Sequence, residues 1–277
     1  MLPVYRDLER YQALSEHSEV SMGACFSQIL HDCSLRINCS ATWSHPDGRS
    51  QFLLLGCEEG IYGIDLNGAH DGDLKRLHHR RCSWMFVYEN VLMAVQGRTS
   101  YLYRHELAAL TQKNMTLKLS KPMNKVPERF VPKRLAITVQ LTETKGCMQC
   151  TVLTGFGPNH ESVFLAACVP SSVLLFQWYE PMMKFLFVRS TELSPSVRLP
   201  LRPFQLVNTG GDFPKLCIGV HQTSDPRVFN YDWVTFGDQV KMDPEATLEM
   251  VDNENRLDIV GMVQTDRKTL MFAYRNK

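Results

Sequence analysis

Long apolar runs are missing from this sequence. The longest candidates, Phe52 to Leu55 and Val173 to Phe176, have the length of strands, whereas a helix that crosses a bilayer needs roughly 18 to 20 apolar residues. The N-terminal residues Met1 to Asp7 carry charge early and lack the apolar region of a signal peptide. The sequence therefore predicts no membrane span, and we expect a cytoplasmic protein.

A charge excess of one sign is also missing. The 30 lysines and arginines and the 29 acidic residues leave a formal net charge of +1, so no global field points to nucleic acid or to an anionic membrane as the partner. Hydrophobic residues make up 44% of the chain and charged residues 21%. This balance is typical of a folded domain and argues against intrinsic disorder.

The cysteines do not form a disulfide or metal pattern. Their number, 9, is odd and their spacing irregular, which indicates reduced thiols. Cys147 and Cys150 form a C-x-x-C pair, but a zinc site needs two more ligands and no second pair follows. A redox pair needs a helix N-terminus, whereas Cys150 opens a β-type run. We predict structural thiols, with no metal and no cofactor; a metal or redox module stays an alternative.

Catalytic motifs are absent as well. The sequence holds no G-x-S-x-G elbow, no Gly-rich phosphate loop, and neither the H-R-D nor the D-F-G motif of protein kinases, since Asp212 and Phe213 are followed by Pro214. Glu58 and Glu59 could serve a glycosidase, although an acidic pair beside a turn glycine is typical of a solvated hairpin. We predict no catalytic residue and keep a propeller enzyme of glycosidase or lyase type as an alternative.

What the sequence does contain is a rhythm of short apolar runs separated by turn residues. A hairpin is predicted at Glu58-Glu59-Gly60, where the glycine can adopt a left-handed conformation. The apolar runs on both sides of this hairpin and along the rest of the chain are 52–57, 61–66, 84–88, 91–96, 100–105, 135–140, 150–153, 163–168, 172–178, 184–189, 204–207, 215–220, 227–231, 246–251, 257–263 and 270–274. Runs of this length and type predict strands.

Many short strands at regular spacing are typical of a sandwich, a barrel or a propeller, and the length of the chain favours the propeller. No Trp-Asp repeat signature occurs, so a WD40 assignment fails. Val4, Leu8, Tyr11 and Leu14 share one helical face. We therefore predict an all-β protein in which a short helix or linker over 1–22 precedes a β-propeller over 23–277.

One basic segment interrupts the rhythm between Thr111 and Arg134. Pro122, Pro127 and Pro132 oppose regular pairing there, and we interpret the segment as a long insertion or connection between blades. Its simplest role is a solvated loop. The alternative is a contact surface for an acidic partner, formed by Lys121, Lys125, Arg129, Lys133 and Arg134.

Three colinear stretches carry a family resemblance. The first runs from Gly23-Ala24-Cys25-Phe26-Ser27 through Cys33–Ile37 to Trp43; the second comprises Gln51–Tyr62 and Arg81–Trp84; the third comprises Thr142–Cys150 and Gln177–Leu186. In this order they resemble the citron-homology (CNH) domain of the germinal-centre kinases, the mitogen-activated protein kinase kinase kinase kinases, and above all the branch of the haematopoietic-progenitor and germinal-centre-like kinases.

The resemblance implies a seven-bladed propeller, of which about five to six blades are expected here because the likeness ends before the family's C-terminal region. It also implies a non-catalytic regulatory domain of a Ser/Thr kinase in the stress-activated MAP kinase cascade, regulating that kinase in cis. The implied partners are small GTPases and other signalling proteins. A stand-alone signalling adaptor is a further alternative. An open strand edge near Leu270 to Tyr274 predicts self-association or aggregation.

Overall fold

The computed structural model describes residues 29–30, 33–67, 74–116, 137–156, 162–195, 197–225, 227–237 and 255–275, with the side chains of 112–116 left out. The chain divides into Met1–Cys33 and Ser34–Lys277, and the fold below is that of the second unit. The predicted lead-in over 1–22, its boundary at residue 23 and the predicted strand 246–251 lie outside the described residues.

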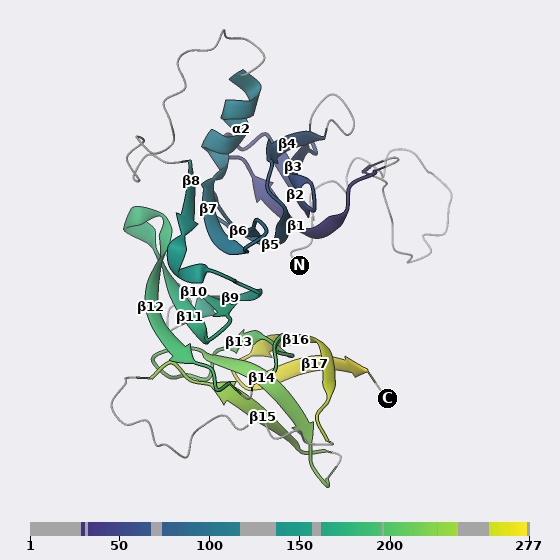
Figure 1. Ribbon diagram of the computed structural model, residues 1–277, viewed down its shortest axis with the longest axis vertical. Helices are drawn as coiled ribbons and strands as arrows, with labels where there is room; N and C mark the ends of the chain where they lie inside the picture. Colours follow the sequence, from purple (N-terminus) through teal and green to yellow (C-terminus); the bar gives the residue numbers. More distant parts are fainter. Residues whose placement is uncertain are drawn as a thin grey trace, which may run out of the picture. The chain divides into compact units, whose positions relative to one another are not determined.

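Five antiparallel sheets, here named A to E, make up the described part of this unit (Figure 1). Sheet A holds β1 (Ile37–Ser44), β2 (Gln51–Cys57), β3 (Gly60–Asp65) and β4 (Lys75–His78); sheet B holds β5 (Cys82–Tyr88), β6 (Val91–Gln96), β7 (Tyr101–Glu106) and β8 (Thr138–Leu141). Sheet C holds β9 (Gln149–Phe156), β10 (Ser162–Val169), β11 (Ser172–Tyr179) and β12 (Lys184–Glu192). Sheet D holds β13 (Gln205–Val207), β14 (Lys215–Gln222) and β15 (Phe229–Val234), and sheet E holds β16 (Asp258–Asp266) and β17 (Thr269–Arg275).

The strands of each sheet pair in chain order, so every sheet is a meander. The first strands of successive sheets touch one another: β1 contacts β5, β5 contacts β9, β9 contacts β13, and β13 contacts β16. Consecutive four-stranded meanders joined at their first strands are the arrangement of propeller blades. The prediction of an all-β propeller is confirmed, and the five sheets among the described residues stand at the lower end of the predicted five to six blades.

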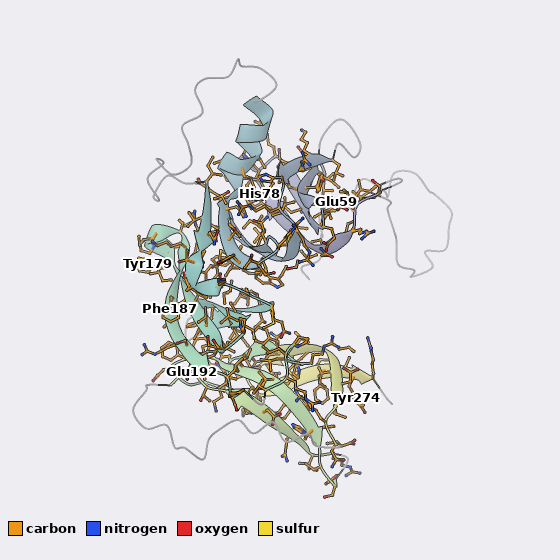
Figure 2. All side chains as sticks on the ribbon, viewed as in Figure 1. Glu59, His78, Tyr179, Phe187, Glu192 and Tyr274 are labelled. Atoms are coloured by element: carbon orange, nitrogen blue, oxygen red, sulfur yellow. The ribbon has the colours of Figure 1, made fainter. Side chains whose placement is uncertain are left out.

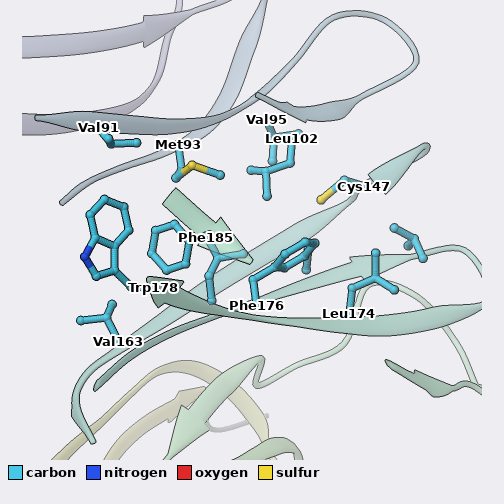
Figure 3. Packing of buried hydrophobic residues seen from close by; sticks show 13 residues of the cluster. Val91, Met93, Val95, Leu102, Cys147, Val163, Leu174, Phe176, Trp178 and Phe185 are labelled. Carbon is cyan, nitrogen blue, oxygen red and sulfur yellow. The ribbon is translucent and has the colours of Figure 1, made fainter. Parts of the chain in front are cut away.

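Each neighbouring pair of sheets shares a hydrophobic core. The core between sheets B and C joins Met93 and Leu102 of sheet B to Phe176, Trp178 and Phe185 of sheet C (Figure 3). Three further cores lie between sheets A and B, C and D, and D and E. A fully buried side chain of this size contributes about 1.5–3 kcal/mol, so the stacking of sheets, not any one sheet, holds the fold together.

Strand β10 is apolar at nearly every position because it lies between two hydrophobic cores. Val163, Leu165 and Ala167 face the core shared with sheet B, whereas Phe164 and Ala166 face the core shared with sheet D. Successive side chains of a strand point to opposite faces. A strand between two cores therefore needs an apolar residue at every position, and the usual alternation with polar residues disappears.

Helix α2 (Leu107–Thr116) corrects the prediction made for the basic segment. The helix begins directly after β7, and β8 then completes the same sheet B. The insertion thus lies inside one blade and not between two blades, and its first part is helical. Leu107 and Leu110 are buried in the core between sheets A and B, so burial of these apolar residues holds the start of the insertion on the fold.

Candidate protein-interaction surface

The C-x-x-C pair lies where β9 begins. The sulfur atoms of Cys147 and Cys150 are 3.4 Å apart, and burial raises the pKa of Cys150 well above its usual range. A thiol with a raised pKa stays protonated near neutral pH, and a protonated thiol is a poor nucleophile and metal ligand. Within the described ranges, no group of three or more histidine, cysteine or acidic side chains is placed to hold a metal ion.

The acidic pair of the β2–β3 turn is engaged in structural contacts. Arg81 donates from Nε to Glu58 Oε2 over 2.7 Å, and Asn38 donates to Glu58 Oε1 over 2.8 Å. These two hydrogen bonds hold the pKa of Glu58 below its usual range. A glycosidase acid needs a raised pKa, so Glu58 is unsuited to that role. Glu59 accepts a hydrogen bond from the backbone N–H of Arg36.

The predicted basic contact residues lie outside the described residues. Lys121, Lys125, Arg129, Lys133 and Arg134 all fall between α2 and β8, in the range 117–136. The structure therefore does not test whether they share a surface.

The structure brings forward a different surface, which sequence reasoning missed. Four large apolar side chains are exposed around the β11–β12 hairpin: Tyr179, Met182, Leu186 and Phe187. Met182 and Phe187 keep 51% and 52% of their surface in contact with solvent. We call this set the β11–β12 hairpin surface. Leu186 and Phe187 are consecutive on β12 and point to opposite faces of sheet C, so this surface includes both sides of the strand. Exposed apolar groups gathered around one element mark interaction sites more often than single ones do.

Local contacts fix the hairpin. The 3₁₀ turn η4 (Glu180–Met182) has a proline in its first positions, and Met183 follows it with a left-handed backbone at φ 47°. Arg104 of β7 donates from Nε and Nη2 to the Met183 carbonyl over 3.2 and 3.1 Å. The turn is thereby tied to sheet B, and its exposed side chains extend from a held backbone.

Strand β12 adds an open edge to this surface. It is the outermost strand of sheet C, and no described strand pairs with its outer side. The Phe187 ring packs against buried Phe176, with ring centroids 5.9 Å apart, so the exposed side chain continues the core outward. Figure 2 shows Tyr179, Phe187 and Glu192 following one another along this hairpin. A sheet edge beside apolar side chains can receive a strand of a partner.

The turn Tyr179-Glu180-Pro181-Met182 reads in the sequence as a mere connection. The signal in the sequence that could have identified this surface is the apolar pair Met182-Met183 inside a turn. The pair Leu186-Phe187 follows on a strand that is apolar at consecutive positions.

No described helix is long and apolar enough to span a membrane.

Comparison with known proteins identifies related sequences. The chain is 36% identical over 211 residues to mitogen-activated protein kinase kinase kinase kinase 3 of Rattus norvegicus, a match that covers 75% of this chain and 24% of the relative. The mouse protein of the same name is 36% identical over the same share of this chain, and the human one 35%, each across 23% of its length. The chain thus spans about a quarter of the length of these relatives.

A solved structure described as the AfRom2 CNH domain is similar with a TM-score of 0.49 and 12% sequence identity, covering 86% of this chain and 65% of that one. The family model of the CNH domain matches residues 49–277. The matched range includes every described strand of the five sheets except β1, which precedes residue 49. The chain belongs to the CNH domain family.

Proposed function

We propose that the chain is a non-catalytic regulatory and protein-interaction domain of a Ser/Thr kinase in the stress-activated MAP kinase cascade. The observation that carries the proposal is the 36% identity to a protein named as a kinase of this cascade, confined to 24% of that protein's length. Kinase motifs are absent from the sequence itself. The chain's contribution to such a protein is therefore recognition, and its place of action the cytoplasm.

The proposed partners are small GTPases or other signalling proteins, together with the kinase domain of the same protein. The β11–β12 hairpin surface supports this proposal, because exposed Met and aromatic side chains are enriched at protein interfaces. Partner binding there would cover Met182 and Phe187 and add contacts along β12.

Pull-downs with a panel of small GTPases, each in its GDP and GTP-analogue state, test partner binding. We expect capture that depends on nucleotide state, and a loss of about tenfold or more in affinity for Phe187→Lys, since a central apolar anchor contributes 2 kcal/mol or more. Met148→Lys is the matched control, because Met148 is also exposed, at 44%, but lies at the start of sheet C, away from the hairpin. An equal effect of both variants, or no capture of any GTPase, contradicts the proposal.

Regulation in cis needs its own test. The phosphorylation rate of the full-length parent kinase is measured with and without the segment that corresponds to this chain. We expect the deletion to change the rate, and addition of the separate chain in trans to restore it in part. An unchanged rate in both experiments contradicts regulation in cis and leaves partner recruitment as the only role.

A further inference from the structure

Three turns of sheets A and B meet around a hollow of about 510 Å³. They are the β2–β3 turn, the β4–β5 connection and the β6–β7 loop. Glu59 on the first turn and His78 at the end of β4 are marked in Figure 2. The side chains that line the hollow belong to Glu58, His79, Arg80, Arg81, Gln96, Arg98, Thr99, Tyr101 and Tyr103, with Gly97 completing it.

The lining carries an excess of positive charge. Three arginines and one glutamate line it, which leaves an excess of two positive charges from these groups. Glu58 accepts a hydrogen bond from Nε of Arg81, and the terminal Nη atoms of Arg81 are not part of this ion pair. Arg98 is exposed and makes no hydrogen bond or ion pair within the part of the chain that the structure describes. Among the described residues, therefore, no carboxylate is paired with Arg80 or Arg98 in the hollow.

The turns that carry these arginines are held in place. The Gly97 N–H donates to the Arg81 carbonyl over 3.0 Å and so joins the two turns. On the other side of the loop, Gly146 and Cys147 donate to the carbonyls of Thr99 and Ser100 over 3.2 and 2.9 Å. Arg98 thus extends from a loop that is bonded at both ends, which lowers the entropy lost when a ligand binds.

Arg80 is positioned by an aromatic residue. Its Nη1 donates to the Tyr103 hydroxyl, its guanidinium carbon lies 5.2 Å from the centre of the Tyr103 ring, and the hydroxyl donates in turn to Gln140 over 2.8 Å. Tyr103 is itself buried. This contact fixes the plane of the guanidinium group, as bidentate recognition of an anion requires.

Below the arginines lies a hydrogen-bonded network centred on the buried side chains of Gln96 and His105. Thr138 bonds to His105 Nδ1 over 2.9 Å, His105 Nε2 to Gln96 Oε1 over 2.8 Å, and Gln96 Nε2 to His78 Nδ1 over 3.2 Å. Burial, together with the positive charges of His78, Arg104 and Arg80, lowers the pKa of His105 to about 3. The His105 ring is therefore neutral near pH 7, and the positive charge of the hollow comes from its exposed arginines.

We propose that this hollow binds a phosphate group carried on a phosphorylated side chain of a protein segment. The Arg80 guanidinium group is held by Tyr103 and Arg98 extends from a held loop, so both can reach a phosphate monoester in this partly enclosed space and meet its double negative charge. The volume exceeds that of a bare phosphate ion, and Tyr101 and Thr99 offer further contacts to the residue that carries it. The choice of a protein as the source rests on the proposed function as an interaction domain.

Fluorescence anisotropy of the full chain with labelled, degenerate peptide pools tests the proposal. One pool carries a central phosphothreonine, a second a phosphotyrosine, and a third neither. We expect saturable binding of a phosphorylated pool only, weakening with salt. Arg98→Gln should lower the affinity about tenfold, since a lost charge-assisted hydrogen bond corresponds to about that factor. Arg227→Gln, at an exposed arginine outside the hollow, should leave it unchanged.

Arg98 has no partner among the described residues, so we expect its variant to fold, and circular dichroism and thermal unfolding verify this. Absence of binding by every phosphorylated pool, or equal losses for Arg98→Gln and Arg227→Gln, overturns the proposal. The proposal is also overturned if inorganic phosphate displaces the peptides with an affinity equal to that of the phosphorylated pools. It is overturned as well if the chain binds only phosphatidylcholine vesicles that contain phosphatidylinositol 4-phosphate.

The GTPase pull-downs separate the two hypotheses. GTPase capture that is insensitive to Arg98→Gln, without peptide binding, overturns the phosphate site alone. Peptide binding without GTPase capture supports the phosphate site and contradicts the proposed GTPase partners.

Discussion

Gly60 and Gly48 are two glycines with positive φ whose missing side chains matter to different degrees. At Gly60, φ is 146°, and an added Cβ would lie 2.3 Å from the backbone oxygen of His78. The hairpin therefore needs glycine because β4 approaches its backbone, and not only because of the turn conformation expected from the sequence. At Gly48, φ is 69° and no atom lies within 4 Å of the position of a Cβ.

We expect Gly60→Ala to lower the free energy of unfolding by about 3 kcal/mol or more, because backbone strain adds to a clash with a backbone atom that cannot turn away. Gly48→Ala, where only the strain applies, should cost about 1 kcal/mol. Urea unfolding of both variants measures the difference. Equal losses would contradict the role given to the His78 carbonyl.

His105 links stability to pH. In the folded chain its pKa is about 3, below the ordinary value of 6.5, because the ring is buried and positive groups surround it. The unfolded chain therefore binds a proton between these two values that the folded chain does not bind. Stability is fully present above pH 6.5 and falls as the pH drops toward 3.

For this residue alone we expect a loss of about 2 kcal/mol between pH 7 and pH 5. His105→Gln removes the titrating group. The variant should have a lower free energy of unfolding than the wild type at pH 7, because hydrogen bonds of His105 are lost. At pH 5 this difference in free energy should be smaller by about 2 kcal/mol. Guanidinium unfolding of both proteins at the two pH values measures the difference. A gap that stays constant would show that His105 does not titrate as inferred.

At the scale of elements, burial on two faces decides which strands can be predicted. β6, β10 and β11 lie between two cores and are apolar at nearly every position, so their sequences already indicate strands. β1 and β4 end their sheet and carry mostly polar residues, as in Lys75-Arg76-Leu77-His78. Backbone pairing to a neighbour makes them strands, and a sequence pattern does not record such pairing.

The candidate site follows the same rule. Arg80 and Arg81 are consecutive in the sequence and Arg98 stands in a separate turn; a charged side chain in a turn usually means a solvated surface. The pairing of β5 with β6 and the hydrogen bond from Gly97 to the Arg81 carbonyl bring Arg98 beside Arg80 and Arg81. Phe187 escaped prediction for the opposite reason, because an apolar residue on a strand is normally buried.

The basic segment allows a prediction at this scale from sequence. If Lys121, Lys125 and Arg129 contact an acidic partner, reversing all three charges should slow association about tenfold and flatten its dependence on salt, since charges near an interface act mainly on the association rate. Surface plasmon resonance with a captured GTPase measures both quantities. Reversal of Lys75, Arg76 and Lys215, exposed or half-exposed positions on other elements, is the control. Unchanged rates would leave the segment a solvated loop.

At the scale of the whole molecule, one hydrophobic core lies between each pair of successive sheets, from the pair A and B to the pair D and E. Sheets B, C and D consequently bury both faces. On sheet E, the half-buried Met262 and Phe272 pack against the core shared with sheet D, whereas the directly paired Val263 and Met271 are 54% and 58% exposed. Sheet E therefore carries apolar side chains on both faces, and only one of these faces is covered by other described residues.

An apolar sheet face beside an open strand edge favours association with another copy of the chain. We expect the average mass in sedimentation velocity to rise with protein concentration, and Met271→Lys to shift it toward the monomer, because a lysine on that face must be desolvated when a second copy covers it. Val228→Lys, at an exposed valine in the β14–β15 connection, should leave the association as it is. A chain that stays monomeric at every concentration would mean that the exposed face of sheet E does not drive association. Equal shifts from both lysines would point to net charge, and not to that face, as the cause.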